Sequence, residues 1–313
     1  MQRIGFILLP GFQIMSLSVM AVFELANESA GGDRYSIEVL SEQGGNVVSS
    51  LGVPLVTSRI TGYGYDTLLI PGNGLAAASP VMLDYLGKAQ HEVRRIGAIC
   101  RGAFLLAEAG LLKGRRATTH WRFAALLAQG YPDIQVEADR IFITDGAIWT
   151  SAGMSAGIDM ALAMVEKDLG SDLARDVAKR LVVYHRRAGG QSQYSTLLDL
   201  SPRTDRVQAV LHFASQNLTR PLSIEQLAEV ANLSPRQFSR QFRSETGKSP
   251  AKAVEQLRVE AARLMLEQGH HSLEVVARET GFGDRERMRR AFMRHYGQSP
   301  QMIRRTFGPS VSA

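Results

Sequence analysis

Cysteine is almost missing from this chain. Among its 313 residues only Cys100 carries a thiol, which excludes an internal disulfide and any metal site made from a cysteine cluster. The sequence also lacks a run of about 20 apolar residues, which a membrane-spanning helix needs. Its opening, MQRIGFILLP, has no basic region followed by a long apolar run and a cleavage site, as a secretory signal would. We therefore expect a cytoplasmic protein with no membrane partner and no metal, and nothing in the sequence indicates a cofactor.

Excess charge is missing from the first two thirds of the chain. Of the 36 Lys and Arg and the 30 Asp and Glu, residues 203–307 hold 18 and 11, which leaves 18 and 19 elsewhere. The net charge of +6 thus combines a part at −1 with a basic part at +7. A basic region of this kind indicates a polyanionic partner. Because 313 residues exceed what one hydrophobic core usually serves, two domains are expected.

Strand-like and helix-like segments alternate along residues 1–185. The predicted strands are short apolar or β-branched runs bounded by Gly, Pro or polar residues: Ile4–Leu9, Ser36–Leu40, Thr67–Ile70, Arg95–Ile99 and Ile141–Thr144. The predicted helices are Ile14–Asn27, Val81–Val93, Ala103–Leu111, Phe123–Gln129 and Ile158–Leu169. Such alternation predicts an α/β fold in which helices cover both faces of a parallel sheet.

The basic part has a different pattern, with no strand signal from Asp205 onward. Before it, residues 186–204 read RRAGGQSQYSTLLDLSPRT, and their Gly, Ser and Pro content is typical of a linker. Within this segment, Tyr194–Leu198 is a candidate to dock on a domain. The predicted organisation is a first domain over 1–188, a linker over 189–204, an all-helical domain over 205–307 and a tail over 308–313.

The helical part contains an internal repeat. The segment SIEQLAEVANLSPRQFSRQFRSETGKSP (223–250) matches SLEVVARETGFGDRERMRRAFMRHYGQSP (272–300), so that Arg240 corresponds to Arg290. Two copies are too few for a solenoid. The repeat therefore predicts two related DNA-reading modules.

Each repeat has the signals of a helix, a short turn and a second helix. Ser223 and Gln226 form a capping box at the start of the first helix. Asn232 suits the left-handed backbone of a helix end, and Gly281 occupies the corresponding place in the second repeat. The second helices are predicted to begin after two capping residues, Ser234 and Asp284.

The second helix of each repeat has an apolar and a charged face. Phe238 and Phe242, like Met288 and Phe292, stand four residues apart and therefore share a buried face. Arginine can donate to guanine O6 and N7 in the major groove, with a discrimination of about 1–3 kcal/mol for each contact. A charged helix face alone is most often plain solvated surface, but the repeat and the local charge favour DNA. The predicted DNA-binding residues are Arg236, Ser239, Arg240, Arg243, Arg285, Glu286, Arg289 and Arg290.

This segment resembles the AraC/XylS-type transcriptional regulators. The stretch GFGDRERMRRAFMRHYGQSP (281–300) matches that family's signature, with Met288 where an aromatic residue is common. In the family a long helix joins two helix-turn-helix units, and Ala251–Gln268 is the candidate for it here. The resemblance implies double-stranded DNA as a partner, with the two reading helices in successive major grooves. It also implies a homodimer, and RNA polymerase is a candidate partner of an activator.

The single cysteine stands where a predicted strand meets a predicted helix. Residues 96–106 read IGAICRGAFLL, which is the layout of a nucleophile elbow. A helix N-terminus stabilises a thiolate, so the pKa of Cys100 is expected to lie below its usual range. The alternative is that Cys100 is a small buried apolar residue, as a lone cysteine most often is.

Around this elbow the first domain resembles the ThiJ/PfpI branch of the class I glutamine-amidotransferase-like superfamily. The resemblance spans residues 3–185 and rests, besides the elbow, on PGNG (71–74), AGLLKGRRATTHW (109–121) and TSAGMSAGIDMAL (150–162). It implies a flavodoxin-like, amidotransferase-like sandwich with a parallel sheet. Together with the helical domain it implies a GlxA-like regulator, a group in which the amidase-like domain is generally a ligand-binding remnant.

The residues themselves indicate a catalytically degenerate domain, so no enzyme is expected. Met15 stands where enzymes of the branch place an acid, although Glu24 reaches that place in another register. A hydrolase also needs a histidine base near the sulfur, and the position after the cysteine is Arg101. No catalytic residue is predicted beyond a residual Cys100. The predicted ligand-binding residues are Cys100, Arg101, Gly72, Asn73, Gly74, Met15, His120, Trp121 and Gly153.

Arg101 carries the most specific ligand hypothesis. Its guanidinium would pair with a carboxylate or another anion of an effector. The alternative is that it lies along the surface and bonds a helix or a dimer partner. For Trp121 the alternative to ligand contact is plain packing.

These features predict a transcription factor that activates a catabolic or transport operon when a small metabolite binds its first domain. The resemblance to GlxA-like regulators implies a nitrogenous effector, such as an amino acid or a quaternary amine. Two other interpretations stay open. One is a cysteine-dependent hydrolase or hydratase that uses Cys100 and is localised by its DNA-binding domain, and the other is an architectural DNA binder without a ligand.

Overall fold

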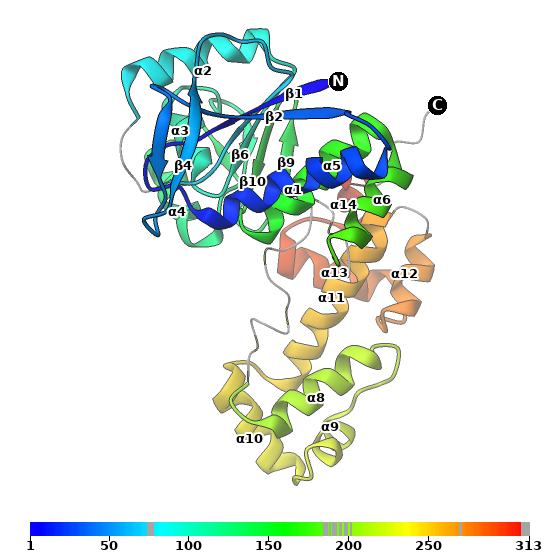
Figure 1. Cartoon of the computed structure of the whole chain (residues 1–313). Coiled ribbons are helices and arrows are strands. Elements are labelled where there is room, and N and C mark those ends of the chain that lie inside the picture. The colour runs from blue at the N-terminus through cyan, green and yellow to red at the C-terminus, as the bar shows by residue number, and fades with distance from the viewer. Residues whose placement is uncertain are drawn as a thin grey trace. The chain divides into compact units, whose positions relative to one another are not determined.

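A computed structural model describes residues 1–73, 78–183, 202–268 and 271–307, together with residues 187, 189, 193, 196 and 200. Two compact units make up the chain, unit 1 over Met1–Gln193 and unit 2 over Tyr194–Ala313. Unit 1 combines strands with helices, whereas the described part of unit 2 is helical (Figure 1).

An eight-stranded sheet lies at the centre of unit 1, in the order β3-β4-β2-β1-β5-β6-β10-β9. Its strands are β1 (Gln2–Ile7), β2 (Tyr35–Ser41), β3 (Gly45–Val48), β4 (Pro54–Arg59), β5 (Thr67–Ile70), β6 (Arg95–Ile99), β9 (Phe142–Asp145) and β10 (Ile148–Ser151). The central strands are parallel, since β1 pairs with β2 and β5, and β6 pairs with β5 and β10. This arrangement confirms the predicted α/β fold.

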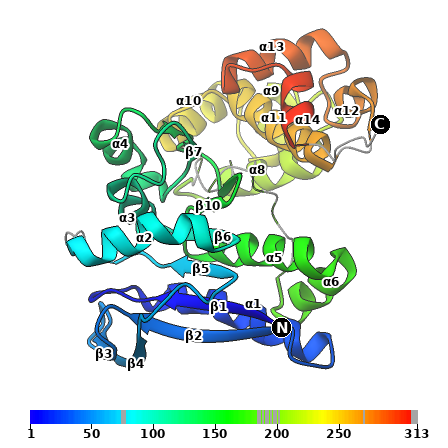
Figure 2. The same ribbon diagram turned by 90° about the horizontal axis from the view of Figure 1, so that it is seen from above.

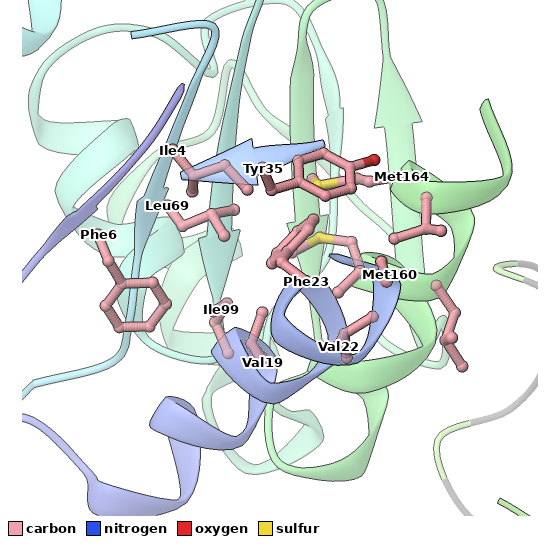
Figure 3. Close-up of a cluster of buried hydrophobic side chains, with 14 of the residues drawn as sticks. Ile4, Phe6, Val19, Val22, Phe23, Tyr35, Leu69, Ile99, Met160 and Met164 are labelled. Atoms are coloured by element: carbon pink, nitrogen blue, oxygen red, sulfur yellow. The ribbon is translucent and has the colours of Figure 1, made fainter. Parts of the chain in front are cut away.

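Helices cover both faces of the sheet (Figure 2). They are the 3-10 turn η1 (Ile14–Leu17), α1 (Ser18–Ser29), α2 (Pro80–Glu92), α3 (Gly102–Glu108), α4 (Trp121–Gly130), α5 (Ser155–Leu169) and α6 (Ser171–Arg180). On one face α1, α5 and α6 enclose a core around Phe23 and Met160 (Figure 3). On the other, α2 and α3 enclose a core that contains Leu106. Neighbouring residues of β1 serve the two cores, Phe6 the first and Ile7 the second, which explains why the strand reads as a continuous apolar run.

The sheet is not parallel throughout, which corrects the prediction at its two edges. β9 pairs antiparallel with β10, and β3 pairs antiparallel with β4. Gly146, with φ of +61°, begins the two-residue turn between β9 and β10. Glycine at the first position of the turn pair Gly146-Ala147 is a hairpin signal that the strand prediction did not use. Two further short strands, β7 (Arg116–Ala117) and β8 (Gln135–Val136), form a separate small sheet.

Unit 2 has one apolar core for each sequence repeat. Its helices are α8 (Asp205–Gln216), α9 (Ile224–Val230), α10 (Pro235–Thr246), α11 (Pro250–Gln268), α12 (Leu273–Glu279), α13 (Arg285–Tyr296) and α14 (Pro300–Phe307). The first core contains Phe238 and Phe242, the second contains Met288 and Phe292, and α11 contributes to both. The predicted buried faces and the joining helix are therefore confirmed.

Local signals set the helix boundaries of the two repeats. The side chains of Ser223, Ser234 and Asp284 each accept a hydrogen bond from the first turn of α9, α10 and α13, respectively. Asn232 and Gly281 have φ of +53° and +77°, the left-handed conformation that the sequence predicts. Among the helices that the structure describes, none combines the length and the apolar composition of a membrane span.

The segment expected to be a linker is anchored at three described positions. Leu200 is buried in the first core of unit 2, and the backbone N–H of Thr196 donates to the Glu260 carboxylate at 3.0 Å. Gln193 forms hydrogen bonds with Thr119 and Trp121 of unit 1. The predicted tail, residues 308–313, lies outside the described residues.

Candidate effector site and DNA-reading surface

Cys100 occupies a tight turn between β6 and α3. Its φ is +57°, a conformation that residues with a side chain seldom adopt. The backbone N–H of Cys100 donates to the carbonyl of Ser151 at 2.9 Å, and the Thr119 hydroxyl donates to the carbonyl of Cys100 at 2.7 Å. Contacts from two other segments therefore hold the elbow that the sequence predicts.

Two glycines allow neighbouring backbones to approach this turn. A Cβ on Gly153 would lie only 2.2 Å from the Cβ of Cys100, and Gly153 has φ of +85°. A Cβ on Gly72 would lie 3.1 Å from the backbone nitrogen of Arg101. Both glycines were predicted as ligand-binding residues, and the structure gives each of them a packing role beside the elbow.

The prediction of an acidic thiol is wrong. Cys100 is 1% exposed and belongs to the first apolar core of unit 1. Burial raises the pKa of its thiol above the usual range, although the N–H and the charge of Arg101 act in the opposite direction. The cost of desolvating a thiolate is thus the larger effect here. Cys100 packs as the small buried residue that the sequence left as an alternative.

Two buried polar atoms beside the elbow have no hydrogen-bond partner within the described residues. They are Nε of Arg101 and Oε1 of Gln13. The backbone N–H of Gln13 donates to the carbonyl of Gly72 at 3.1 Å, so Gln13 and Arg101 both adjoin Gly72. One atom is a donor and the other an acceptor. An unpaired buried polar atom costs about 1–3 kcal/mol, which a hydrogen-bonding partner would recover.

Sequence reasoning missed Gln13. The signal that marks it is a polar residue inside the otherwise apolar run GFQIM (11–15), two positions before the predicted Met15. The Met15 side chain is 46% exposed, and Glu24, its alternative in another register, is an exposed residue of α1. Asn73 is half-buried beside Gly72, whereas Gly74 lies outside the described residues.

His120 and Trp121 lie at the start of α4, close to Arg101. The Arg101 guanidinium carbon is 5.2 Å from the centre of the Phe123 ring, which is a cation–π contact. His120 caps α4, because its Nδ1 accepts a hydrogen bond from the backbone N–H of Arg122 at 3.3 Å. Burial, followed by the charges of Arg122 and Arg101, lowers the pKa of His120. The Trp121 side chain is 54% exposed and is therefore not a core residue.

Gln193, the last residue of unit 1, forms hydrogen bonds with residues at the start of α4 and in the loop before it. Its Nε2 donates to the carbonyls of Thr119 at 2.7 Å and Ala138 at 2.9 Å, and its Oε1 accepts from the backbone N–H of Trp121 at 2.7 Å. Thr119 in turn bonds the carbonyl of Cys100. A short series of hydrogen bonds thus connects the elbow to the residue that precedes unit 2 in the chain. In the described ranges, no group of three His, Cys, Asp or Glu side chains could hold a metal ion.

In unit 2, α10 presents free arginines to solvent. Arg236, Arg240 and Arg243 are exposed, and Ser239 between them is half-buried. Within the described part of the chain, no acid or carbonyl holds the three guanidinium groups. This surface is ready to receive phosphates or base edges without breaking an ion pair.

The arginines of α13 are instead engaged with acids. Arg289 bonds Glu286 through two hydrogen bonds of 2.8 and 2.9 Å, and Arg290 lies 3.8 Å from the same carboxylate. Arg285 pairs with Glu274 of α12 at 2.7 Å. The hydrogen bond from Arg289 is the main reason why the pKa of Glu286 lies below its usual range. The two repeats share the same order of helices, but the predicted DNA-reading face carries free arginines in α10 and ion-paired arginines in α13.

Comparison with known proteins covers both units. Residues 2–167 match the DJ-1/PfpI family, and residues 227–306 match a helix-turn-helix domain. The HTH-type transcriptional regulator GlxA of Rhizobium meliloti is 32% identical to this chain over 98% of the chain and 97% of its own length. The chain belongs to the GlxA-like family of HTH-type transcriptional regulators.

Other proteins similar to this GlxA-like regulator are also named as transcriptional regulators. The HTH-type transcriptional regulator CdhR of Pseudomonas aeruginosa is 31% identical, over 97% of this chain and 91% of its own length. The crystal structure of an AraC family transcriptional regulator from Pseudomonas putida matches with a TM-score of 0.53 and 27% identity, and covers 58% of this chain and 100% of that one. The predicted family, fold class and regulatory function are confirmed, and the relatives that match nearly the whole chain are named as transcriptional regulators.

Proposed function

We propose that this GlxA-like regulator binds a small carboxylic acid with an N–H group beside Cys100, and that binding changes how α10 and α13 engage DNA. The observation that carries the proposal is the pair of unpaired buried atoms, Arg101 Nε and Gln13 Oε1. Arg101 would donate to the carboxylate of the effector, and Gln13 would accept from its N–H. One effector would thereby complete both hydrogen bonds.

The same two atoms select among nitrogenous effectors. Amino acids and amides carry an N–H that can donate to Gln13 Oε1, whereas a quaternary amine has none. A quaternary amine would instead need aromatic or acidic surroundings. The site therefore favours an amine or amide that retains an N–H. In this proposal the regulator acts as a cytoplasmic homodimer that activates a catabolic or transport operon through RNA polymerase.

A thermal-shift screen of small metabolites against the full-length chain tests the effector site. A ligand of the native state stabilises it by about 2.7 kcal/mol at 100 times its Kd. We expect amino acids or amides with a carboxylate to raise Tm, and Arg101→Ala to abolish that rise. Arg122→Ala is the matched control, because Arg122 is a nearby exposed arginine in the first turn of α4. An unchanged rise in Arg101→Ala would contradict the proposal.

A second variant tests the role of the N–H group. Gln13→Met keeps the size of the side chain but removes its acceptor. We expect it to bind an effector and the fully N-methylated form of that effector, which has no N–H, equally, whereas the natural chain prefers the form with N–H. If the natural chain bound both forms equally, Gln13 would have no part in recognition.

The geometry favours binding over hydrolysis at Cys100. Burial raises the pKa of the thiol, which disfavours the thiolate that would act as a nucleophile. His120 Nδ1 already accepts a hydrogen bond from Arg122, which occupies one of the two imidazole nitrogens. A hydrolase would show turnover that Cys100→Ser abolishes, whereas we expect Cys100→Ser to keep its DNA binding.

Gln193 is proposed to couple the effector site to the DNA-binding unit. Its amide bonds the loop that also contacts Cys100, and the chain enters unit 2 at the next residue. Gln193→Ala is expected to leave the effector-induced rise in Tm intact while DNA binding, measured by titration, no longer responds to the effector. Gln129→Ala, at an exposed position of α4, is the control. A full effector response in Gln193→Ala would contradict the coupling role.

A further inference from the structure

A cavity of about 360 Å³ lies inside unit 2, where the two helical repeats meet. Its walls come from the loop before α9, from α11, from the turn before α13 and from α13 itself. The charged residues of its lining are four arginines and one acid: Arg258, Arg287, Arg290, Arg294 and Glu255. This surplus of positive charge indicates an anionic ligand.

Arg258 is held at the cavity by backbone groups. Its Nε donates to the carbonyl of Leu218 at 3.1 Å, and its Nη2 donates to the carbonyl of Arg220 at 2.6 Å. Both acceptors are neutral, so they fix the guanidinium in place and leave its charge uncompensated. Burial, followed by the charge of Arg287, lowers the pKa of Arg258. A negative ligand would relieve this repulsion.

The one carboxylate in the cavity lining, that of Glu255, already has an arginine partner. Glu255 accepts hydrogen bonds from Arg294 at 2.7 and 3.3 Å, and lies 3.3 Å from Nε2 of His295. Burial alone would raise the pKa of Glu255, but its contacts with Arg294 and His295 hold it below the usual range. Within the described residues, Arg258 and Arg287 therefore have no carboxylate partner.

The cavity is continuous with the reading face of the second repeat, because Arg290 belongs to both. A duplex that receives α10 and α13 in successive major grooves must present its intervening minor groove, with the flanking phosphates, to the surface between them. We propose that this cavity binds a backbone phosphate of that DNA, with Arg258 and Arg287 as the groups that contact it. The assignment rests on the proposed DNA contact by α10 and α13. Such a contact fixes the register of the duplex without reading its sequence.

Titration of DNA binding against salt, with the full-length chain, tests this assignment. The probes are a duplex that the natural chain selects from a random-sequence pool, and a scrambled duplex of the same composition. Each phosphate contact adds about −0.9 to the slope of log K against log salt, so a fourfold rise in salt weakens binding about 3.5-fold for each contact. Arg287→Gln is expected to remove one such increment, and to weaken binding to both duplexes by the same factor.

Arg278→Gln is the matched control, because Arg278 is an exposed arginine of α12 that does not line the cavity. It is expected to keep the natural slope. An Arg287→Gln slope equal to that of the control would overturn the assignment, as would a loss confined to the selected duplex, which indicates base reading. Stabilisation of the natural chain by inorganic phosphate, combined with an unchanged slope in Arg287→Gln, would identify a free anion as the ligand. Failure of the natural chain to bind any duplex would instead refute the proposed DNA contact by α10 and α13.

A substitution that removes negative charge from the cavity provides an independent check. Glu255→Gln removes the carboxylate from the cavity and releases Arg294 from its ion pair. We expect tighter binding to both duplexes and a steeper salt slope. A weaker or unchanged affinity in a variant with the natural Tm would contradict a phosphate site in this cavity.

Discussion

Arg240→Ala is expected to lower the preference of the regulator for one base pair of its selected duplex by about 1–3 kcal/mol, which is roughly 5- to 150-fold. Arg240 is exposed on α10 and has no partner in the described part of the chain, so its guanidinium is available for a base edge. The measurement compares the selected duplex with duplexes that carry single substitutions. In the natural chain, substitution at one base pair should weaken binding more than substitution at its neighbours. In Arg240→Ala this difference should be lost.

Arg290→Ala is expected to have a smaller effect at its own base pair. Arg290 lies 3.8 Å from Glu286, so binding to DNA exchanges this contact for a new one. Exposed ion pairs contribute about 0–1 kcal/mol, and the loss of this pair reduces the free energy gained from the contact with the base by that amount. Arg206→Ala, at an exposed position of α8, is the control and should weaken all duplexes alike. Equal base preferences in the natural chain, Arg240→Ala and Arg290→Ala would refute the assignment of the reading helices.

Gly281→Ala is expected to destabilise unit 2 by more than about 3 kcal/mol and to abolish DNA binding. A Cβ at this position would lie 1.8 Å from the carbonyl oxygen of Leu218, and the residue has φ of +77°. The clash is with backbone, which cannot rotate away as a side chain can. The carbonyl of Leu218 also accepts a hydrogen bond from Arg258 of α11, so the clash would also disturb this bond.

Two spectroscopic signals separate the units in this experiment. Both tryptophans, Trp121 and Trp149, belong to unit 1, so their fluorescence reports its unfolding alone. We expect an unchanged fluorescence transition in denaturant and an earlier loss of helical circular dichroism. Gly247→Ala is the matched control, because Gly247 has φ of +72° but nothing within 4 Å of its added Cβ. Its cost is expected to be about 1 kcal/mol. Equal losses in the two variants would show that the contact with Leu218 is unimportant.

Much of unit 2 was predictable because its signals act over a few residues. A capping side chain such as Ser234 bonds an N–H three residues away, and Phe238 and Phe242 meet because four residues bring a helix back to the same face. In unit 1, β5 and β6 were predicted with their observed bounds, since both are short apolar runs buried on both faces. The edge strand β3 and its neighbour β4 were missed because much of their surface is exposed, which leaves no apolar run to detect.

The sequence by itself determined the family, the two-part organisation and the helix-turn-helix repeats, because local spacing and short motifs carry that information. Tertiary structure decided the chemistry. Whether the thiol of Cys100 is acidic depends on burial by segments distant in the chain, and burial reversed the direction that the adjacent helix suggested. The approach of Gln13 and of Arg101 to Gly72, the bonds of Gln193 and the charged cavity around Arg258 likewise join residues far apart in sequence. Desolvation and ion pairing depend on distances in space, which a linear pattern does not contain.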